Sequence, residues 1–439
     1  VLALLETAQA TGEGFWQWAA ADTLEYVRRD LTHPEGGFYS AEDADSVPPE
    51  RAADPGARKT EGAFYLWTAQ DVDDLLGADA GIVKRRFGIE PDGNAPHDPH
   101  DEFTGRNLLY TAASIEEIVT DTGRSEDEVL QVINASRRTM FEARALRPRP
   151  HLDDKVLASW NGLTIAAFAR AARVLDEVEL DAEGGLRAEL LAVATRAARF
   201  LHASLWHAPS RTLLRSWRDG RATIEAYSED YASVVWGMLE LFQATGSAAW
   251  LRWAMELQER QDELFWDEGG GWFGTTGRDR SVLLRLKEDY DGAEPAASSV
   301  SALNLIVLSH LVPHPHWPEM VQRTLGRFGD RIAGGARAVP FTMAALAAHH
   351  AGLTQVVLVG PEQRSDTVAL RRTLASRYLP FSIVFPVAGG DAQRELAELL
   401  PWVAPMTEVG GRSAAYVCRD FTCDRPVTDA GELAALLEA

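Results

Sequence analysis

The chain has 439 residues, of which 46% are hydrophobic and 25% are charged, a balance typical of globular proteins with two or three domains. No apolar run approaches the roughly 20 residues that a membrane-spanning helix needs, so a membrane is not an expected partner. The 43 basic and 65 acidic residues give a net charge of −22, which argues against nucleic acid as a partner. Only two cysteines are present, so we expect no disulfide framework and a reducing, cytoplasmic location.

Helical periodicity dominates the chain up to about residue 350. Apolar residues at three- and four-residue spacing predict helices over 1–10, 14–31, 125–145, 155–174, 185–205, 228–244, 247–265, 296–312, 317–333 and 338–350. Many of these helices form adjacent pairs, and one pair is repeated. Residues 5–12 align with residues 239–246, and the same alignment matches Trp16 with Trp250.

Paired helices can stack into an open solenoid or close into an α/α toroid. Long loops with short strands, at 36–68, 213–227 and 270–291, follow alternate helices here. Loops gathered on one face favour a toroid with a site at its mouth. The stretch from 87 to 113 is rich in Pro and Gly and is interpreted as a surface insertion, with a lid over the site as the alternative.

The pattern changes beyond residue 350. Strands are predicted over 355–360, 381–385 and 414–418, with a helix over 362–378. We therefore predict a mainly α domain over residues 1–350 and a small α/β region over 351–439.

Four stretches place charged and aromatic residues where a core or a turn does not need them. The first, residues 36–46, contains Tyr39, Glu42 and Asp45. Carboxylates beside an aromatic ring are compatible with a sugar or metal site, although the frame of a calcium loop is absent. A solvated acidic loop is an equally good interpretation.

The second stretch, residues 151–162, precedes and opens a predicted helix. Asp154 can cap this helix, while Lys155, Trp160 and Asn161 follow within its first turns. A Trp beside an Asn suits stacking and hydrogen bonding to a polyol. Lys155 is also one of only four lysines in the chain. The alternative is that Asp154 is only a cap and Trp160 only a core residue.

The third and fourth stretches also lie at helix starts. Asp230 and Tyr231 follow Ser228 at the start of one helix, where capping alone accounts for the acid. Residues 287–299 contain Lys287, Glu288, Asp291 and Glu294 before a helix that begins near Pro295. This density of charge exceeds what capping requires. In a toroid, these helix starts would face one mouth.

Metal and cofactor signals are weak. His97, His100 and Asp101 have no predicted helix or strand to fix them, and Cys418 and Cys423 do not form a zinc motif. Phosphate-binding and dinucleotide-binding glycine motifs do not occur in a chemical context. We therefore expect neither a metal nor a cofactor, and interpret the cysteines as structural or incidental.

Residues 36–46, 61–68, 153–162 and 291–295 together resemble the thioredoxin-domain-containing family that includes YyaL-like bacterial proteins and the spermatogenesis-associated proteins of animals. The resemblance covers nearly the whole chain. It implies an (α/α)6 barrel similar to N-acylglucosamine 2-epimerases and six-hairpin glycosidases. It further implies a thioredoxin-like domain upstream, with that domain and the first barrel helices missing from this sequence.

The chemistry implied by the resemblance needs an acid and a base. Epimerases of that kind are similar in using histidines, but only His151 lies in one of the four stretches. An inverting glycosidase needs two carboxyl groups about 6.5 to 9.5 Å apart. The predicted catalytic residues are therefore carboxylates: Asp45, Asp154, Asp230 and Glu288. The predicted substrate-binding residues are Tyr39, Glu42, Lys155, Trp160, Asn161, Tyr231, Lys287, Asp291 and Glu294.

The sequence thus favours a carbohydrate-directed α/α-barrel protein, acting as a sugar epimerase or a glycosidase. An alternative is a non-catalytic module that binds a sugar or a partner beside a thioredoxin-like redox domain. A third interpretation is a scaffold whose acidic loops only remain solvated.

Overall fold

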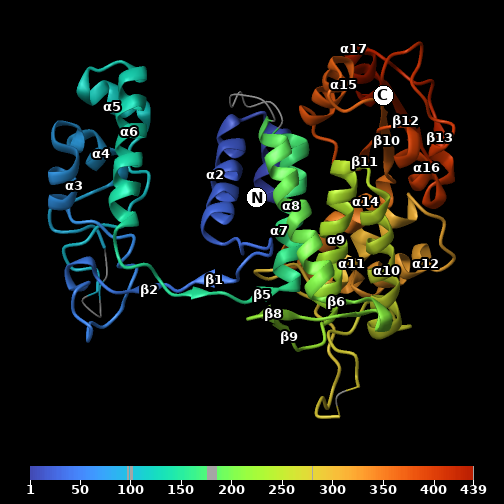
Figure 1. The fold of residues 1–439 in the computed structure, drawn as a ribbon, viewed down its shortest axis with the longest axis horizontal. Coiled ribbons are helices and arrows are strands. Elements are labelled where there is room, and N and C mark those ends of the chain that lie inside the picture. Colours follow the sequence, from blue (N-terminus) through green and yellow to red (C-terminus); the bar gives the residue numbers. More distant parts are fainter. Residues whose placement is uncertain (96–97, 99–101, 176–184, 279, 439) are drawn as a thin grey trace. The chain divides into compact units, whose positions relative to one another are not determined.

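The computed structural model describes residues 1–95, 98, 102–175, 185–278 and 280–438. The described chain is mainly helical and divides into two compact units (Figure 1). Unit 1 consists of residues 1–40 and 154–439, and unit 2 of residues 41–153. No helix among the described residues is both long enough and apolar enough to cross a membrane.

Unit 1 is built from helix hairpins. Its helices are α1 (Leu2–Thr11), α2 (Gly14–Asp30), α7 (Ala158–Val174), α8 (Gly185–Ser204), α9 (Ser228–Thr245), α10 (Ala248–Phe265), α11 (Ala297–Ser309), α12 (Trp317–Arg327), α13 (Gly329–Gly335) and α14 (Pro340–Ala351). Helices α1, α7, α9, α11 and α14 pack in succession, and α2, α8, α10 and α12 each pack against one of the first four. This inner and outer arrangement is that of an α/α barrel, which confirms the predicted fold class.

Helices α7 and α9 approach each other closely. A Cβ atom added to Gly162 would lie 2.4 Å from the backbone of Ser233, and one added to Gly237 would lie 2.5 Å from the Gly162 carbonyl oxygen. Glycine at both positions therefore allows the two backbones to touch. Phe168, Met238 and Phe242 are completely buried in the surrounding core.

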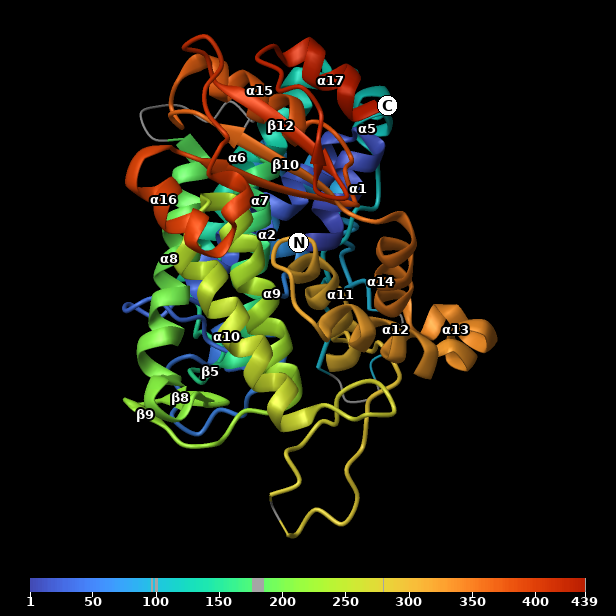
Figure 2. The same cartoon turned by 90° about the vertical axis from the view of Figure 1, so that its right-hand side faces the viewer.

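The last part of unit 1 contains a four-stranded sheet with the order β11-β10-β12-β13. Its elements are β10 (Thr354–Val359), α15 (Ser365–Ala375), β11 (Ser382–Val387), α16 (Gly390–Leu399), β12 (Ala414–Arg419), β13 (Thr422–Cys423) and α17 (Ala430–Glu438). Strands β10 and β11 are parallel and joined through α15, while β12 is antiparallel to β10. The strands lie where the sequence predicts them. Strand β11 packs on α9, and Figure 2 shows this α/β region at one end of α7 and α9.

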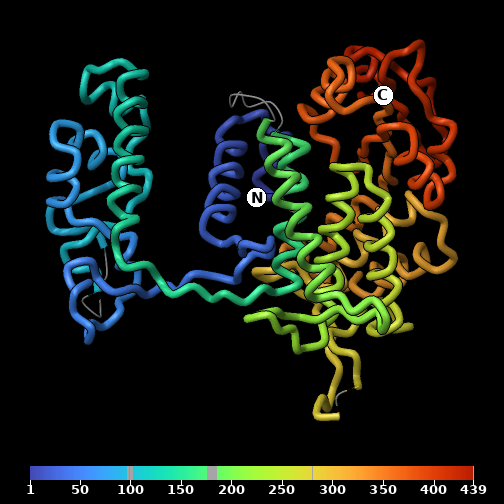
Figure 3. The backbone as a smooth tube through the Cα atoms, viewed as in Figure 1, coloured from blue at the N-terminus to red at the C-terminus, as the bar shows by residue number. Residues whose placement is uncertain are grey.

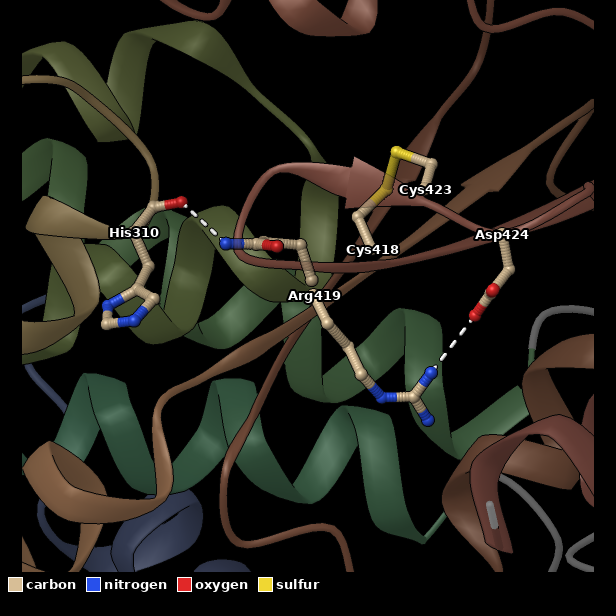
Figure 4. Close-up of a disulfide and its surroundings, with 6 residues drawn as sticks. His310, Cys418, Arg419, Cys423 and Asp424 are labelled. Carbon is tan, nitrogen blue, oxygen red and sulfur yellow. Dashed lines mark hydrogen bonds and ion pairs between the residues drawn. A yellow bond between two sulfur atoms is a disulfide. The ribbon is translucent and has the colours of Figure 1, made fainter.

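The two cysteines are joined in a disulfide between β12 and β13 (Figure 4). Cys418 and Cys423 face each other in register across a two-residue turn. The turn residues Asp420 and Phe421 have φ angles of 49° and 61°, as a tight hairpin turn of this kind requires. Arg419 bonds Asp424 at 3.0 Å in the same hairpin. The two cysteines were expected to form no disulfide framework, yet the structure pairs them in one disulfide. Hairpin register, which brings them together, is not visible in their spacing.

Unit 2 has its own small cores. Its elements are β1 (Ala41–Glu42), β2 (Asp45–Ser46), β3 (Thr60–Glu61), α3 (Ala69–Leu76), α4 (Ala80–Phe87), α5 (Ile115–Thr122), α6 (Glu126–Ala145) and β4 (Leu152–Asp153). The chain enters unit 2 along β1 and ends it along β4, and these two strands pair with each other (Figure 3). Val72, Val83 and Met140 form one buried cluster, and Ile118 and Ile133 belong to another. Residues 41–153 thus form a compact unit of their own, whereas the sequence predicts a single domain over residues 1–350.

Candidate active site

A cavity of about 210 Å³ lies where α7, α9 and α11 begin. The loop before α11 supplies half of its wall, and the first two turns of the three helices supply the rest. The lining residues are Leu163, Glu229, Ala232, Ser233, Glu288, Tyr290, Gly292, Ala293, Glu294, Pro295, Ala297 and Val300. The structure therefore brings together helix starts that are far apart in the sequence.

Three carboxylates define the chemistry of this cavity. Glu229 comes from the first turn of α9, and Glu288 and Glu294 come from the loop before α11. Burial raises the pKa of the Glu288 carboxyl, and the negative charges of Glu229 and Glu294 raise it further. A carboxyl group with a raised pKa keeps its proton to higher pH and can donate it.

Trp160 connects α7 to this group of carboxylates. Its indole Nε1 donates a hydrogen bond of 2.6 Å to Oε1 of Glu294. Trp160 is 39% exposed and lies beside the cavity through this contact with the lining residue Glu294. Tyr290, which lines the cavity, is 55% exposed. Two partly exposed rings therefore accompany the three carboxylates.

Arg215 fixes the start of α9. It pairs with Glu229 at 2.7 Å and with Asp230 at 2.9 Å. Asp230 is fully buried and also accepts hydrogen bonds from the backbone N–H groups of Tyr227, at 2.9 Å, and Ser159, at 3.2 Å. Burial raises the Asp230 pKa to about 6, although Arg215 opposes the shift. Asp230 thus joins the starts of α7 and α9, and it is not part of the cavity lining given above.

Asp291 and Lys287 hold the loop that carries Glu288 and Glu294. Asp291 accepts hydrogen bonds from the backbone N–H of Ala296 at 2.9 Å and from that of Phe341 at 2.8 Å. Lys287 pairs with Asp267 and donates to the carbonyl oxygen of Gly270 at 2.7 Å. Both side chains position this loop through contacts outside the cavity.

Asn161 and Tyr231 lie in the core. The Asn161 amide accepts from the Phe38 N–H at 2.7 Å and donates to the Phe38 carbonyl at 3.0 Å. The Tyr231 hydroxyl accepts from the N–H of Leu213 at 3.0 Å. Both residues are 1% exposed. Their polar groups therefore hold loops against the barrel.

Asp154, Tyr39 and Lys155 lie together in another part of unit 1. Asp154 pairs with Arg218 at 2.7 Å. Burial raises the pKa of Tyr39, and the charge of Asp154 contributes to the shift. The Lys155 carbonyl accepts from the hydroxyl of Ser40 at 2.8 Å. These three predicted residues do not belong to the set that lines the cavity at α7, α9 and α11.

Glu42 and Asp45 belong to unit 2. Glu42 pairs with Arg149 at 3.0 Å. Asp45 lies on β2, opposite Glu61 of β3. Their predicted roles therefore rest on the sequence alone.

Glu229 and Tyr290 are not among the residues predicted from the sequence, although each is adjacent to a predicted residue, Asp230 or Asp291. Glu229 is adjacent to Asp230, and capping accounted for both acids. The signal that separates them is helix geometry, because neighbouring residues point about 100° apart around a helix. Asp230 turns into the core, whereas Glu229 lines the cavity.

Across the part of the chain that the structure describes, no group of three or more His, Cys, Asp or Glu residues could hold a metal ion. His97, His100 and Asp101 lie outside the described residues. The expectation that these three residues bind no metal therefore stays a prediction.

No family model matches this chain. Solved structures that resemble it include a D-mannose isomerase, with 12% identity and a TM-score of 0.31 over 77% of this chain and 72% of that one. The cellobiose 2-epimerase of Spirochaeta thermophila has 10% identity and a TM-score of 0.32 over 72% of this chain and 71% of that one.

Sequence relatives are much closer. An uncharacterised protein of Caenorhabditis elegans is 30% identical over 94% of this chain and 56% of its own length. Spermatogenesis-associated protein 20 of Rattus norvegicus is 37% identical over 98% of this chain and 55% of its own length. The chain thus spans about half the length of the curated relatives it matches. It is similar, over 99% of its residues and at 37% identity, to spermatogenesis-associated protein 20 of Homo sapiens.

Proposed function

We propose that the cavity at the starts of α7, α9 and α11 binds a carbohydrate and transfers protons at the bound sugar, as a glycosidase or an epimerase does. The observation that carries this proposal is the meeting of Glu229, Glu288 and Glu294 in one cavity beside Trp160. Acid and base catalysis at a sugar requires one protonated and one ionised carboxyl group. Aromatic rings provide the apolar face on which a sugar ring can stack.

The environments of the carboxylates suggest how the roles divide. Glu288 has the raised pKa, so we assign it the role of proton donor. Glu229 is paired with Arg215 at 2.7 Å, and we assign it the role of base. Glu294 accepts a hydrogen bond from Trp160 and is assigned to holding a sugar hydroxyl. Asp230 and Asp291 position this set by accepting hydrogen bonds from backbone N–H groups at the helix starts.

A second candidate is a sugar-binding module without turnover. It is supported by the ion pair of Glu229 with Arg215 and the hydrogen bond of Glu294 with Trp160, because both contacts already engage groups that a reaction would use. A thioredoxin-like domain beside the barrel also remains a proposal. It rests on the resemblance of the sequence motifs, and the greater length of the relatives leaves room for it.

The test is a screen of oligosaccharides and reducing sugars in heavy water, followed by NMR. Epimerisation would incorporate deuterium at a sugar carbon, whereas hydrolysis would create new reducing ends. Glu288→Gln should lower either rate at least about 100-fold while sugar binding persists. Glu225→Gln, at an exposed glutamate outside the cavity lining, is the matched control and should retain the rate.

Binding of a sugar without any conversion would support the second candidate. The first proposal would fail if Glu288→Gln turned over as fast as the unchanged protein. Both would fail if no sugar altered the melting temperature.

A further inference from the structure

A second cavity, of about 110 Å³, lies at the opposite ends of α7 and α9. Its wall comes from the ends of these helices, from α1, from the start of α8 and from the α/β region, mainly β11 and α15. On α9, Glu229 lines the first cavity and Gln243 lines the second. These residues are 14 positions apart, which corresponds to roughly 20 Å along a helix. The second cavity is therefore separate from the proposed sugar site.

The charge of this cavity contrasts with that of the whole protein. Five arginines line it, against two glutamates, in a chain whose net charge is −22. The arginines are Arg170, Arg173, Arg187, Arg371 and Arg377. Guanidinium groups present several donors in a planar fork that matches carboxylate and phosphate groups. A concentration of them around a cavity favours an anionic ligand.

Part of this positive charge is balanced within the protein. Glu240 is 3% exposed at its side chain and accepts hydrogen bonds from Arg170, at 2.8 Å, and Arg173, at 2.5 Å. Arg187 donates to the carbonyl oxygens of Ala172 and Ala244, at 2.8 and 2.9 Å, and so caps the ends of α7 and α9. These contacts hold the arginines rigidly in the wall.

The hydrogen bonds of the Arg173 guanidinium are incomplete. Its Nε is buried and has no hydrogen-bond partner among the described residues. Burial lowers the Arg173 pKa to about 10; Glu240 opposes this shift, and the nearby positive charge of Arg170 adds to it. A buried donor without a partner costs free energy, and an anion in the cavity would lower that cost.

Much of the rest of the wall is apolar, although Gln9, Gln243, Thr367 and Ser382 also line it. Val174, Leu358, Leu374 and Val384 are among the residues that line it. A simple inorganic ion would leave this surface without a partner, whereas a ligand with an apolar or ring-shaped body would cover it. We propose that this cavity binds a small organic anion, a carboxylate or a phosphate monoester, between the barrel and the α/β region.

Calorimetry with phenyl phosphate, benzoate and inorganic phosphate, each against chloride at equal ionic strength, tests this proposal. At least one of the two organic anions should bind more tightly than inorganic phosphate, because the apolar wall contacts the ring. Arg371→Gln should weaken that binding about tenfold or more. Arg372→Gln is the matched control, since the neighbouring Arg372 is exposed and is not among the lining residues.

Arg377→Gln provides a second lining variant if Arg371→Gln fails to fold, and it should weaken binding in the same way. The proposal is overturned if neither organic anion binds more tightly than inorganic phosphate, or if the lining variants and Arg372→Gln respond equally. Glu288→Gln should leave anion binding unchanged. This separates a failure here from a failure of the proposed sugar site.

Discussion

The indole N–H of Trp160 and the carboxylate of Glu294 meet at 2.6 Å, although 133 residues separate them in the chain. Trp160 belongs to α7, and Glu294 lies in the loop before α11. This hydrogen bond joins two of the helix starts that surround the proposed sugar site. It also places an aromatic ring next to one of the carboxylates that line the cavity.

Replacing Trp160 by Phe keeps an aromatic face and removes the N–H donor. A hydrogen bond to a charged group contributes about 1.5 to 3 kcal/mol, so the Kd for a sugar that binds should rise about tenfold. Trp160→Ala should raise it further, because the stacking surface is also lost. Titration calorimetry measures both. Equal affinity in all three proteins would show that Trp160 does not contact the ligand.

The pH dependence of turnover follows from Glu288. Its raised pKa keeps the proton donor intact to higher pH, and activity should fall as the pH rises through that pKa. Glu229→Gln removes a negative charge that raises the Glu288 pKa. In this variant, the alkaline limb of the pH profile of kcat/KM should therefore move to lower pH, whether or not the maximal rate also falls.

Glu225→Gln removes one negative charge outside the cavity lining and serves as the control for that experiment. Its alkaline limb should coincide with that of the unchanged protein. A limb that stays fixed in Glu229→Gln would mean that another group donates the proton.

The contact of α7 with α9 should tolerate no added side chain. In Gly162→Ala, the new Cβ would lie 2.4 Å from the Ser233 backbone, and overpacking of this kind costs about 3 kcal/mol. Gly326→Ala in α12 is the matched control, because its Cβ would meet nothing within 4 Å. That change should stabilise the protein by about 0.5 to 1 kcal/mol. Urea unfolding of both variants measures the difference, and equal midpoints would contradict the close approach.

The buried ion pairs of Glu240 should be costly to break. Glu240→Gln leaves Arg170 and Arg173 without their shared carboxylate, which should lower the free energy of unfolding by about 3 to 5 kcal/mol. Glu398→Gln changes only an exposed pair with Arg252, at 4.0 Å, and should cost less than about 0.5 kcal/mol.

The same carboxylate predicts an acid-dependent loss of stability. Burial opposes ionisation of Glu240, but Arg170 and Arg173 outweigh it and lower the Glu240 pKa to about 2. A lowered pKa stabilises the folded state above the unfolded value of 4.5, and this contribution disappears as the pH falls toward 2. Glu240→Gln should lack this component, so its stability deficit should shrink between pH 5 and pH 2. A constant deficit over that range would contradict the assignment.

The sequence by itself determined the helices and strands of unit 1. Apolar periodicity depends on residues three or four apart, and the predicted α/β strands lie at β10, β11 and β12. Helix starts were predicted to within about three residues, but the expected cap of α7 was wrong. That helix begins after Leu157 without a side-chain cap, and Asp154 pairs with Arg218 instead. Those local signals also located two of the stretches that line the cavity, around Asp230 and around Glu294.

Only the tertiary structure decided what each polar side chain contacts. Asn161 and Trp160 are neighbours in the sequence, yet Asn161 bonds the backbone of Phe38 in the core while Trp160 bonds Glu294 beside the cavity. Their partners lie more than 100 residues away and are chosen by how the hairpins pack. The arginine cavity has the same origin, because Arg173 and Arg371 meet only where the α/β region covers the ends of α7 and α9. Local periodicity fixes which face of a helix is apolar, but the chain must fold before distant charges share a cavity.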